Sequence, residues 1–426
     1  MELQLPKGTK DFPPEEKILR DKVVGTLKKV FELYGYAPLE TPIIEKFDVL
    51  SSKYAGGAEI LKETFKFNDQ GDRELGLRYD LTVTLSRYIG MNPNVKMPFK
   101  RYQIGEVFRD GPVGSARYRQ FLQCDVDVIG SSSMATDAEI IALINAAFSK
   151  LGFEIVIKAN NRKLLNEILD YCGIEKAKQE SAILSVDKLE KFGLNVVKNE
   201  LREQKIEDRK IEKIMDLINV KGNNGEKLSQ LKKLLPDSKG LEEIDNLLNY
   251  LNNFNVEADF DVSLARGLSY YTGTVVEAFL KNSSVKSSVC AGGRYDNMIG
   301  MFLGKGSFPA VGVSFGVDRI FDAMLEKQEA KRKTTAVAYV IPIKTLNEST
   351  KIAQQLRNAG INTDIDAMDR SISKNLEYAN TLGIPYVVII GKKELEENKV
   401  KLRDMKTGKE EMLNIDEIID NLNNRL

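Results

Sequence analysis

The sequence predicts an α+β fold in which an antiparallel sheet with a helical insertion is followed by a C-terminal α/β domain. Three observations predict this fold. Two strand-like segments flank a short loop, a long charged segment has helical character, and strands alternate with helices near the C-terminus. The 426 residues suffice for two or three domains of roughly 100 to 200 residues each. We expect a first domain over 1–325 with the insertion at about 165–250, a linker over 326–335, and a second domain over 336–426.

The first predicted element is an amphipathic helix over residues 15–34. Apolar residues recur at helical spacing from Leu19 to Tyr34, and a Pro-Pro pair just before the segment is typical of a helix start. The segment GYAPLETPIIE (35–45) then leads into extended structure. Two strands follow, FKRYQIGEVFRD (99–110) and RQFLQCDVDVIG (119–130), and the short loop between them predicts an antiparallel hairpin.

The later part of the chain is predicted to contain first a run of helices and then strands that alternate with helices. Charged segments such as KNELREQKIEDRKIEKIMDLI predict helices through about 165–250, and strand signals return at 256. EKQEAKRKTT (326–335) is a polar linker. After it come the strand AVAYVIPI, the helix STKIAQQLRNAG, the strand INTDID, the helix ISKNLEYANTLG and the strand IPYVVIIG. This alternation predicts an α/β domain with a mostly parallel sheet.

The composition of the chain limits the chemistry that it can carry out and the cell compartment in which we expect it. Lys plus Arg (62) equals Asp plus Glu (62), so binding of a polyanion must come from local patches. The chain has three widely separated cysteines and no segment typical of a secretory signal or a membrane span, so we expect a cytoplasmic protein without membrane contact. It has no histidine, which excludes protein imidazole as general base, nucleophile or metal ligand.

The second hairpin strand has one apolar and one polar face. With a period of two, Phe121, Gln123, Asp125 and Asp127 share the polar face. Such a face ordinarily meets solvent. Arg109, at the end of the neighbouring strand, favours a binding surface instead, because it brings a cation beside the acids.

A second unusual segment, ARGLSYYTGTVVEAF, covers residues 265–279. Arginine offers a planar fork of donors, tyrosine an apolar ring with a polar tip, and glycine lets a backbone approach a ligand closely. The combination predicts a lined pocket. If the segment is extended, Tyr270 points away from Tyr271, so we expect Tyr270 to be a core aromatic residue.

Several motifs together resemble a known family. GYAPLETP, then FR followed by RYRQFLQ, then GVSFGVDRI (312–320) are similar to the three signature motifs of class II aminoacyl-tRNA synthetases. ARGLSYYTGTVVE and AGGRYDNMIG (291–300) resemble the two histidine-binding motifs of the histidyl-tRNA synthetase family. The resemblance covers nearly the whole chain. It implies a class II synthetase-type antiparallel sheet in the catalytic domain and a C-terminal α/β anticodon-binding domain.

The resemblance implies roles for three arginines and one aromatic residue. Arg109 is expected to contact the α-phosphate of ATP, and Phe121 to stack on adenine. Arg319 is expected on the γ-phosphate side of a bent ATP. Arg266 would reach the α-phosphate opposite Arg109, which makes these two the implied catalytic residues. Arginine provides the bidentate phosphate geometry that lysine lacks.

The resemblance also implies a histidine pocket. At its amino-acid end, Asp80 with Thr82 would bind the α-amino group, and Gln123 would contact the carboxylate near Arg266.

At the ring end of the implied histidine pocket, Asp127 and Tyr271 would pair with the two imidazole nitrogens, with Tyr295 close by. A carboxylate and a hydroxyl suit a ring that has one donor and one acceptor.

The implied function is ATP-dependent ligation of L-histidine to the 3′ end of histidine tRNA. It would proceed through histidyl-adenylate and release pyrophosphate and AMP. ATP enters as a substrate that carries Mg²⁺, and no protein metal site is implied. A homodimer is expected from the resemblance. A histidine-free chain suits this chemistry, because the substrate carboxylate is itself the nucleophile.

The sequence departs from the family pattern at three places. Gly111 stands where many members have glutamate, and Asp80 and Asp127 replace glutamates that are common elsewhere. Because the loop GPVGSARY (111–118), which contains Gly111, lacks the extra basic and amide residues often seen there, recognition of the extra 5′ guanosine of histidine tRNA stays open.

Two other functions also stay open. One is a histidine-sensing regulatory subunit of ATP phosphoribosyltransferase, and the other is a pure binding module. The regulatory paralogue typically lacks the C-terminal domain and the catalytic arginines. This chain keeps Arg109, Arg266 and Arg319 as well as the C-terminal α/β pattern, which favours the ligase.

Overall fold

The computed structural model describes residues 2–51, 62–114, 118–267, 270–304, 306–327 and 332–425. The chain folds into two compact units, of which the larger comprises Met1–Lys10 and Val23–Leu325 and the smaller Asp11–Lys22 and Glu326–Leu426. The domain bounds expected from the sequence stay predictions. Residues 328–331 of the expected linker lie outside the described residues.

The larger unit contains an eight-stranded sheet with the order β1-β5-β6-β11-β10-β9-β7-β8. Its strands are β1 (Ala37–Pro38), β5 (Phe99–Phe108), β6 (Gln120–Ile129), β7 (Ile155–Asn161), β8 (Asp259–Phe260), β9 (Thr274–Leu280), β10 (Cys290–Arg294) and β11 (Ala310–Gly316). The pairs β1/β5 and β7/β8 are parallel, and the other neighbouring pairs are antiparallel. The predicted antiparallel sheet is confirmed.

The predicted hairpin is the pair β5 and β6. The two strands pair over their full length, from Phe99 opposite Ile129 to Phe108 opposite Gln120. This register sets Arg101 opposite Asp127. Cross-strand partners share one face of a sheet, so the two side chains meet.

One face of this sheet packs on helices α1 (Pro14–Leu33) and α5 (Met134–Lys150). Leu27 and Phe31 of α1 are fully buried with Cys124 and Val126 of β6 in the main apolar core. The ring of Phe31 lies 5.4 Å from that of Phe315 on β11. The apolar face predicted for the second hairpin strand therefore faces the core, which leaves its polar face on the other side of the sheet.

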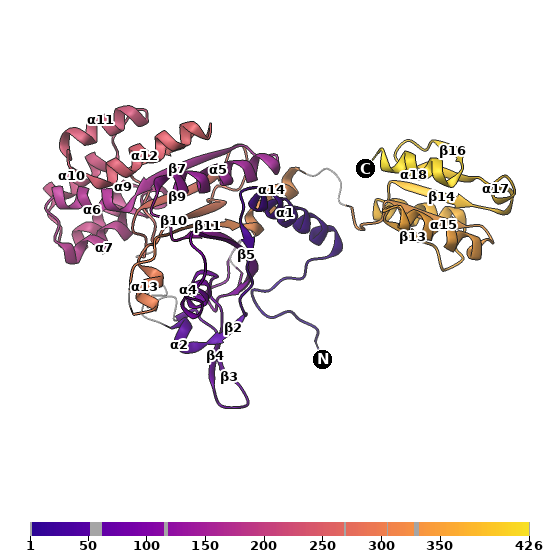
Figure 1. Ribbon diagram of the computed structural model, residues 1–426, viewed down its shortest axis with the longest axis horizontal. Coiled ribbons are helices and arrows are strands. Elements are labelled where there is room, and N and C mark those ends of the chain that lie inside the picture. Colours follow the sequence, from indigo (N-terminus) through magenta and orange to yellow (C-terminus); the bar gives the residue numbers. More distant parts are fainter. Residues whose placement is uncertain are drawn as a thin grey trace. The chain divides into compact units, whose positions relative to one another are not determined.

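A run of helices separates β7 from β8 (Figure 1). The helices are α6 (Arg162–Tyr171), α7 (Lys176–Val186), α8 (Leu189–Phe192), α9 (Leu194–Glu203), α10 (Asp208–Ile218), α11 (Asn224–Leu234) and α12 (Lys239–Asn253). The segment expected to be helical, about 165–250, lies within this run. In Figure 1 these helices gather beyond the β7 end of the sheet, where α6 and α12 contact β7.

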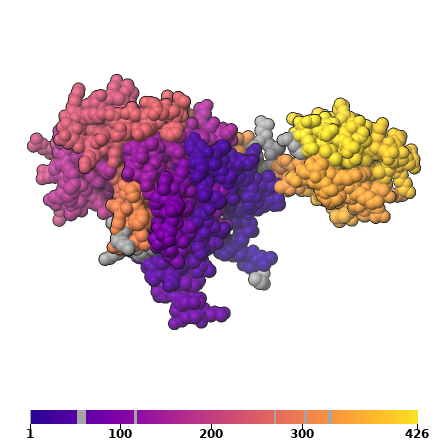
Figure 2. Space-filling view, viewed as in Figure 1, coloured from indigo at the N-terminus to yellow at the C-terminus, as the bar shows by residue number. Residues whose placement is uncertain are grey.

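The remaining elements of the larger unit lie around the sheet. They are β2 (Ile44–Lys46), α2 (Phe47–Leu50), β3 (Lys66–Asn68), β4 (Glu74–Leu77), α4 (Thr82–Met91), α13 (Met298–Phe302) and α14 (Val317–Lys327). Strands β2, β4 and β3 form a separate small sheet. Its β3–β4 hairpin projects from the body of the larger unit as the dark purple protrusion in Figure 2. Helix α14 continues through the first two residues of the expected linker.

The smaller unit contains a five-stranded sheet with the order β13-β12-β14-β15-β16. Its elements are β12 (Ala338–Pro342), α15 (Leu346–Asn358), β13 (Thr363–Ile365), α16 (Ile372–Leu382), β14 (Tyr386–Ile390), α17 (Lys392–Glu396), β15 (Val400–Asp404), β16 (Glu410–Leu413) and α18 (Ile415–Asn423). The predicted alternation is confirmed as far as β14. The sheet is only half parallel, because β14, β15 and β16 pair antiparallel.

None of the helices in the described ranges is long and apolar enough to cross a membrane.

Candidate active site

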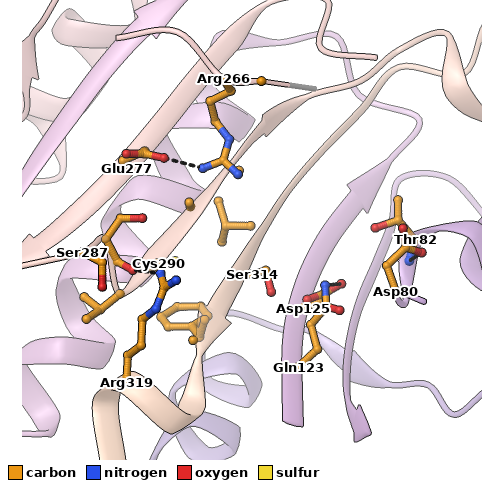
Figure 3. A pocket seen from close by; sticks show the side chains of 18 of the residues that line it. Asp80, Thr82, Gln123, Asp125, Arg266, Glu277, Ser287, Cys290, Ser314 and Arg319 are labelled. Carbon is orange, nitrogen blue, oxygen red and sulfur yellow. Dashed lines mark hydrogen bonds and ion pairs between the residues drawn. The ribbon is translucent and has the colours of Figure 1, made fainter. Parts of the chain in front are cut away.

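A pocket of about 950 Å³ opens on the polar face of the large sheet. The start of α4, strands β6, β9, β10 and β11, the start of α14, and the segment after Asp261 contribute to its lining. It brings together every site residue expected from the sequence: Asp80, Thr82, Arg109, Phe121, Gln123, Asp127, Arg266, Tyr271, Tyr295 and Arg319. Figure 3 shows the arginines Arg266 and Arg319 across the pocket from Asp80 and Thr82.

The polar face of β6 forms the pocket floor. Asp125 and Asp127 are each only 4% exposed, so the solvent-facing interpretation of this strand is wrong at both positions. Backbone geometry creates the room for Asp127, because a Cβ on Gly312 would lie 1.9 Å from its Oδ1. Gly312 stands directly opposite Asp127 on β11.

Two buried partners hold Asp127 in place. The Tyr295 hydroxyl donates to its Oδ1 at 2.5 Å. The guanidinium of Arg101, which is fully buried, pairs with its Oδ2 at 2.8 Å. Arg101 also donates to the carbonyl of Leu81 just ahead of α4, so it links the floor to that helix.

Burial raises the pKa of each acid in this part of the pocket. Desolvation raises the pKa of Asp127, while the charge of Arg101 acts in the opposite direction. Desolvation raises the pKa of Asp125 to about 7, again against Arg101 and with Asp127 adding to the rise. These carboxylates are in low-dielectric surroundings, where a cationic ligand is bound strongly.

Asp80 lies at the start of α4. Its Oδ1 accepts from the backbone amides of Thr82 at 3.0 Å and Val83 at 2.9 Å. Burial raises its pKa, and these two amides partly offset the rise. The helix start therefore fixes one carboxylate oxygen of Asp80.

Gln123 is oriented by its neighbour on the same face of β6. Its Nε2 donates to Asp125 Oδ2 at 3.2 Å. Its Oε1 is buried and has no hydrogen-bond partner among the described residues. In this orientation the side chain offers an acceptor to the pocket, whereas the role expected from the sequence, contact with a carboxylate, needs a donor.

Arg266 is held by an acid that the sequence did not single out. Its Nη1 pairs with Oε1 of Glu277 on β9 at 2.7 Å, as the dashed line in Figure 3 shows. Its guanidinium also lies 5.6 Å from the ring of Tyr271. The contact with Glu277 fixes the direction in which Arg266 points.

The other two arginines are also anchored. Arg319, in the first turn of α14, donates from Nη1 to the carbonyl of Ser288 at 2.6 Å. Arg109, just after β5, lies 4.2 Å from the Tyr79 ring and 4.9 Å from the Phe121 ring. Arg109 and Phe121 thus form one stacked surface at the pocket.

Tyr270 packs against two buried apolar clusters, as expected of a core aromatic residue, but it does not point away from Tyr271. The segment is not extended here, and the ring of Tyr270 lies 4.7 Å from that of Tyr271 and 6.3 Å from that of Tyr295. Tyr270 lines the pocket instead of pointing away from Tyr271. Leu268 and Ser269, which precede it, lie outside the described residues.

Sequence reasoning missed Arg101 and Glu277. Both lie in strands, where a lone charge ordinarily indicates a solvent-facing position. The alternation of side chains along β5 places Arg101 on the same face as Gln103, which is also buried. Two polar residues on one strand face are a signal that could have pointed to Arg101. Glu277 carried no comparable signal.

No group of three or more acidic or cysteine side chains placed to hold a metal ion occurs in the described part of the chain. The pocket instead offers Arg266 and Arg319 on one side and the carboxylates of Asp80 and Asp125 on the other (Figure 3). Such a site can hold a phosphate-bearing group beside a cationic one.

The fold and the site together define the class of protein to which the chain belongs. An antiparallel sheet that carries one arginine after β5 and another at the start of α14, both lining one pocket, is that of a class II aminoacyl-tRNA synthetase. The chain belongs to the histidyl-tRNA synthetase family, whose model matches residues 8–320. A second model, described as an anticodon binding domain, matches residues 337–425.

Individual relatives agree with this membership. Histidine–tRNA ligase 1 of Bacillus cereus is 43% identical over 424 residues, covering 96% of this chain and 97% of the relative. Histidine–tRNA ligase of Clostridium tetani is 39% identical over 432 residues, covering 98% and 97%. The crystal structure of histidyl-tRNA synthetase from Nostoc sp. PCC 7120 matches with a TM-score of 0.90 and 31% identity, covering all of both chains.

The regulatory alternative is not favoured. A solved structure from Bacillus halodurans, described as an ATP phosphoribosyltransferase regulatory subunit/histidyl-tRNA synthetase, covers 88% of this chain and 96% of its own with a TM-score of 0.74. It is only 20% identical to this chain, so it shows the fold alone.

Proposed function

We propose that this chain ligates L-histidine to the 3′ end of histidine tRNA at the expense of ATP. The observation that carries the proposal is that three anchored arginines and the acids Asp125 and Asp127 line one pocket. Family membership and the names of the relatives, histidine–tRNA ligases at about the same length, support the substrate.

In the first step the carboxylate of histidine attacks the α-phosphorus of ATP. The bond between the α-phosphorus and the bridging oxygen to the β-phosphate breaks, pyrophosphate leaves, and histidyl-adenylate forms. Arg109 and Arg266 stabilise the charge that builds on the α-phosphate from opposite sides. Arg319 holds the γ-phosphate side, and Mg²⁺ arrives with ATP as part of that substrate.

In the second step a ribose hydroxyl at the 3′ end of the tRNA attacks the carbonyl carbon of the adenylate. The ester bond forms as the bond between the carbonyl carbon and the phosphate oxygen breaks, AMP leaves with that electron pair, and the hydroxyl proton passes to the phosphate of AMP. No protein imidazole is needed in either step, because positioning and substrate groups supply the reactivity. The absence of histidine from the chain is thus compatible with both steps.

Histidine itself is bound between the two ends of the pocket. Asp80 with Thr82 receives the α-ammonium group. Asp127, held by Tyr295, and Tyr271 pair with the ring nitrogens. An analogue without ring nitrogens would leave these buried polar groups unpaired, so we expect discrimination of roughly 10⁴-fold or more.

The remaining parts of the proposal follow from the family. Residues 336–426 form the domain that binds the anticodon, residues 1–325 form the catalytic domain with its insertion, and 326–335 link them. The enzyme acts as a homodimer in the cytoplasm. The match of residues 337–425 to an anticodon binding domain supports the tRNA as partner.

The first step is tested by exchange of radiolabelled pyrophosphate into ATP, measured with each of the twenty amino acids. We expect exchange with histidine alone. Arg266→Ala should abolish it, while Arg202→Ala, which removes an arginine of an exposed ion pair on α9, should not change it. Exchange with another amino acid, or equal exchange by both variants, would count against the proposal.

A further inference from the structure

A short turn near the N-terminus contacts the segment that carries Arg109, and the proposed reaction assigns this turn no role. The turn covers residues 6–9, in which the amide and the hydroxyl of Thr9 donate to the carbonyl of Pro6 at 3.1 and 2.7 Å. Gly8 and Thr9 are its half-buried residues. The turn therefore meets the rest of the larger unit at these two residues.

The carbonyl of Gly8 is bonded to the residue just ahead of β6. It accepts from the backbone amide of Arg119 at 2.8 Å. The carbonyl of Arg119 in turn accepts from the backbone amide of Arg109 at 2.8 Å. The second hydrogen bond continues the β5/β6 hairpin beyond its last pair, Phe108 with Gln120. The backbone of Arg109 is thus connected to the N-terminal turn through a single residue.

The contact at Gly8 requires glycine for two reasons. Its φ is +85°, a left-handed conformation that favours glycine. A Cβ there would lie 2.8 Å from Cγ of Arg119 and 2.9 Å from Cγ2 of Val113, which belongs to the loop between β5 and β6. A side chain at this position would therefore displace Arg119, Val113 or the turn itself.

The side chain of Arg119 extends this contact to the residues that follow Arg109. Its Nη2 pairs with Asp110 Oδ1 at 3.1 Å, and its Nε donates to the carbonyl of Gly111 at 3.3 Å. The backbone amide of Asp110 donates to the carbonyl of Glu63 at 2.7 Å. The start of the loop is therefore held by Glu63 and Arg119, and the N-terminal turn holds Arg119.

The side-chain contacts of Arg109 are weak in comparison with those of Arg266. Its Nε lies 3.5 Å from the carbonyl oxygen of Tyr79, which is long for a hydrogen bond. Its guanidinium otherwise stacks on the rings of Tyr79 and Phe121. Arg266, by contrast, forms an ion pair with Glu277 at 2.7 Å. The direction of Arg109 therefore depends more strongly on how its backbone is held.

We propose that Gly8 is a positioning residue for ATP, because the N-terminal turn holds Arg109 in the direction that meets the α-phosphate. This inference deepens the proposed function and rests on it. The histidine end of the pocket has other supports, since α4 holds Asp80 and Arg101 holds Asp127. Disruption of the turn should therefore affect ATP and spare histidine.

Histidine-dependent pyrophosphate exchange at varied ATP, together with isothermal titration of histidine without ATP, tests the inference. In Gly8→Ala we expect kcat/KM for ATP to fall about 10- to 100-fold, because a phosphate-binding arginine is misplaced. The dissociation constant of histidine should stay within about twofold of the wild-type value, which also shows that the variant is folded.

Gly152→Ala is the matched control for backbone strain. Gly152 has a φ of +76°, so alanine is strained there as well, but its Cβ would meet no atom within 4 Å. This variant should keep kcat/KM for ATP within about twofold of the wild type.

Two truncations test the turn without a strained residue. Removal of residues 2–9 deletes the turn and should reproduce the effect of Gly8→Ala. Removal of residues 2–5, which are exposed and precede the turn, should leave both the ATP and the histidine measurements unchanged.

Three results would overturn the role of Gly8. They are an unchanged kcat/KM for ATP in Gly8→Ala, an equal loss in Gly152→Ala, and a parallel loss of histidine affinity, which would show that the turn supports the whole fold. Failure of the wild-type protein to exchange pyrophosphate with histidine would instead overturn the proposed function.

Discussion

At the scale of single residues, the site depends on contacts that hold its charged groups in fixed directions. Arg266 is aimed by Glu277, Asp127 by Arg101 and Tyr295, and Gln123 by Asp125. In each case a buried or half-buried partner fixes a group that would otherwise have several rotamers. Such preorganisation is what allows positioned charges to act on a transition state.

Glu277→Ala should lower the rate constant of histidine-dependent pyrophosphate exchange by about 10- to 100-fold, because Arg266 loses its anchor. The KM for histidine should change much less, since Glu277 lies on the arginine side of the pocket (Figure 3). Glu277→Gln, which keeps an acceptor for Arg266 Nη1, should recover part of the loss. Steady-state kinetics of the two variants measure this. A rise in KM with no fall in rate would show that Glu277 acts on histidine binding instead.

Asp125 makes the ligand-free fold sensitive to pH. Burial raises its pKa from 3.8 to about 7 among Arg101, Asp127, Asp80 and Ser314, so the folded state holds this proton more tightly than the unfolded state. The stability that this group contributes is therefore fully present below pH 3.8 and is lost as the pH rises toward 7.

Asp125→Asn, which cannot ionise, should therefore be more stable than the wild type at about pH 8, by a few kcal/mol at about 1.4 kcal/mol per pKa unit. The difference should shrink at about pH 5. Urea unfolding of the ligand-free proteins at both pH values measures it. A variant that is less stable at the higher pH, or a difference that does not depend on pH, would contradict this account of Asp125.

At the scale of elements, the sheet positions the floor of the site through its register. The β5/β6 pairing sets Arg101 opposite Asp127, and the β6/β11 pairing sets Gly312 opposite the same residue. Arg101 supplies the positive charge opposite the Asp127 carboxylate, and Gly312, which has no side chain, leaves space for that carboxylate. A shift of one residue in β6 would turn Asp127 to the apolar face.

Gly312→Ala tests the role of this register. A Cβ at Gly312 would lie 1.9 Å from Asp127 Oδ1, so Asp127 must leave its place, and we expect histidine affinity to fall by about 10-fold or more. Gly25→Ala in α1 is the matched control, because its Cβ would meet no atom within 4 Å, and alanine is the better helix former. Titration with histidine measures both variants. Equal histidine affinity in the two would refute the importance of Gly312.

The sequence predicted helices and strands better than it predicted which strands pair and which side chains contact one another. The hairpin β5/β6 and the alternation up to β14 follow from periodicity, which depends on local residue order. The antiparallel β15/β16 pair was missed, so the C-terminal sheet was expected to be mostly parallel. Family motifs found the residues that line the pocket. They did not find Arg101 or Glu277, because their roles arise from cross-strand pairing and from contact with Arg266.

Tyr270 shows the limit of periodicity in a loop. The expectation that Tyr270 and Tyr271 point apart assumed an extended segment. A turn precedes β9 instead, and the two rings lie 4.7 Å apart. Neighbouring residues in a turn do not alternate sides as they do in a strand, so only the structure could place Tyr270 at the pocket.

At the scale of the whole molecule, two successive parts of the chain match two different family models. Residues 8–320 match histidyl-tRNA synthetase and residues 337–425 match an anticodon binding domain. In the proposed function, the pocket of the larger unit forms the adenylate and the C-terminal domain binds the tRNA, and both are needed for ligation. The chain without histidine carries out this chemistry in our account with carboxylates and arginines alone.

The central claim is that the full chain joins histidine to its tRNA. The most direct measurement is aminoacylation by the purified protein, with ATP, radiolabelled histidine and either a histidine tRNA transcript or a transcript for another amino acid. The account predicts that histidine becomes acid-precipitable only with the histidine tRNA, and that Arg266→Ala prevents this. Pyrophosphate exchange without any transfer to the histidine tRNA, or equal transfer to both transcripts, would contradict it.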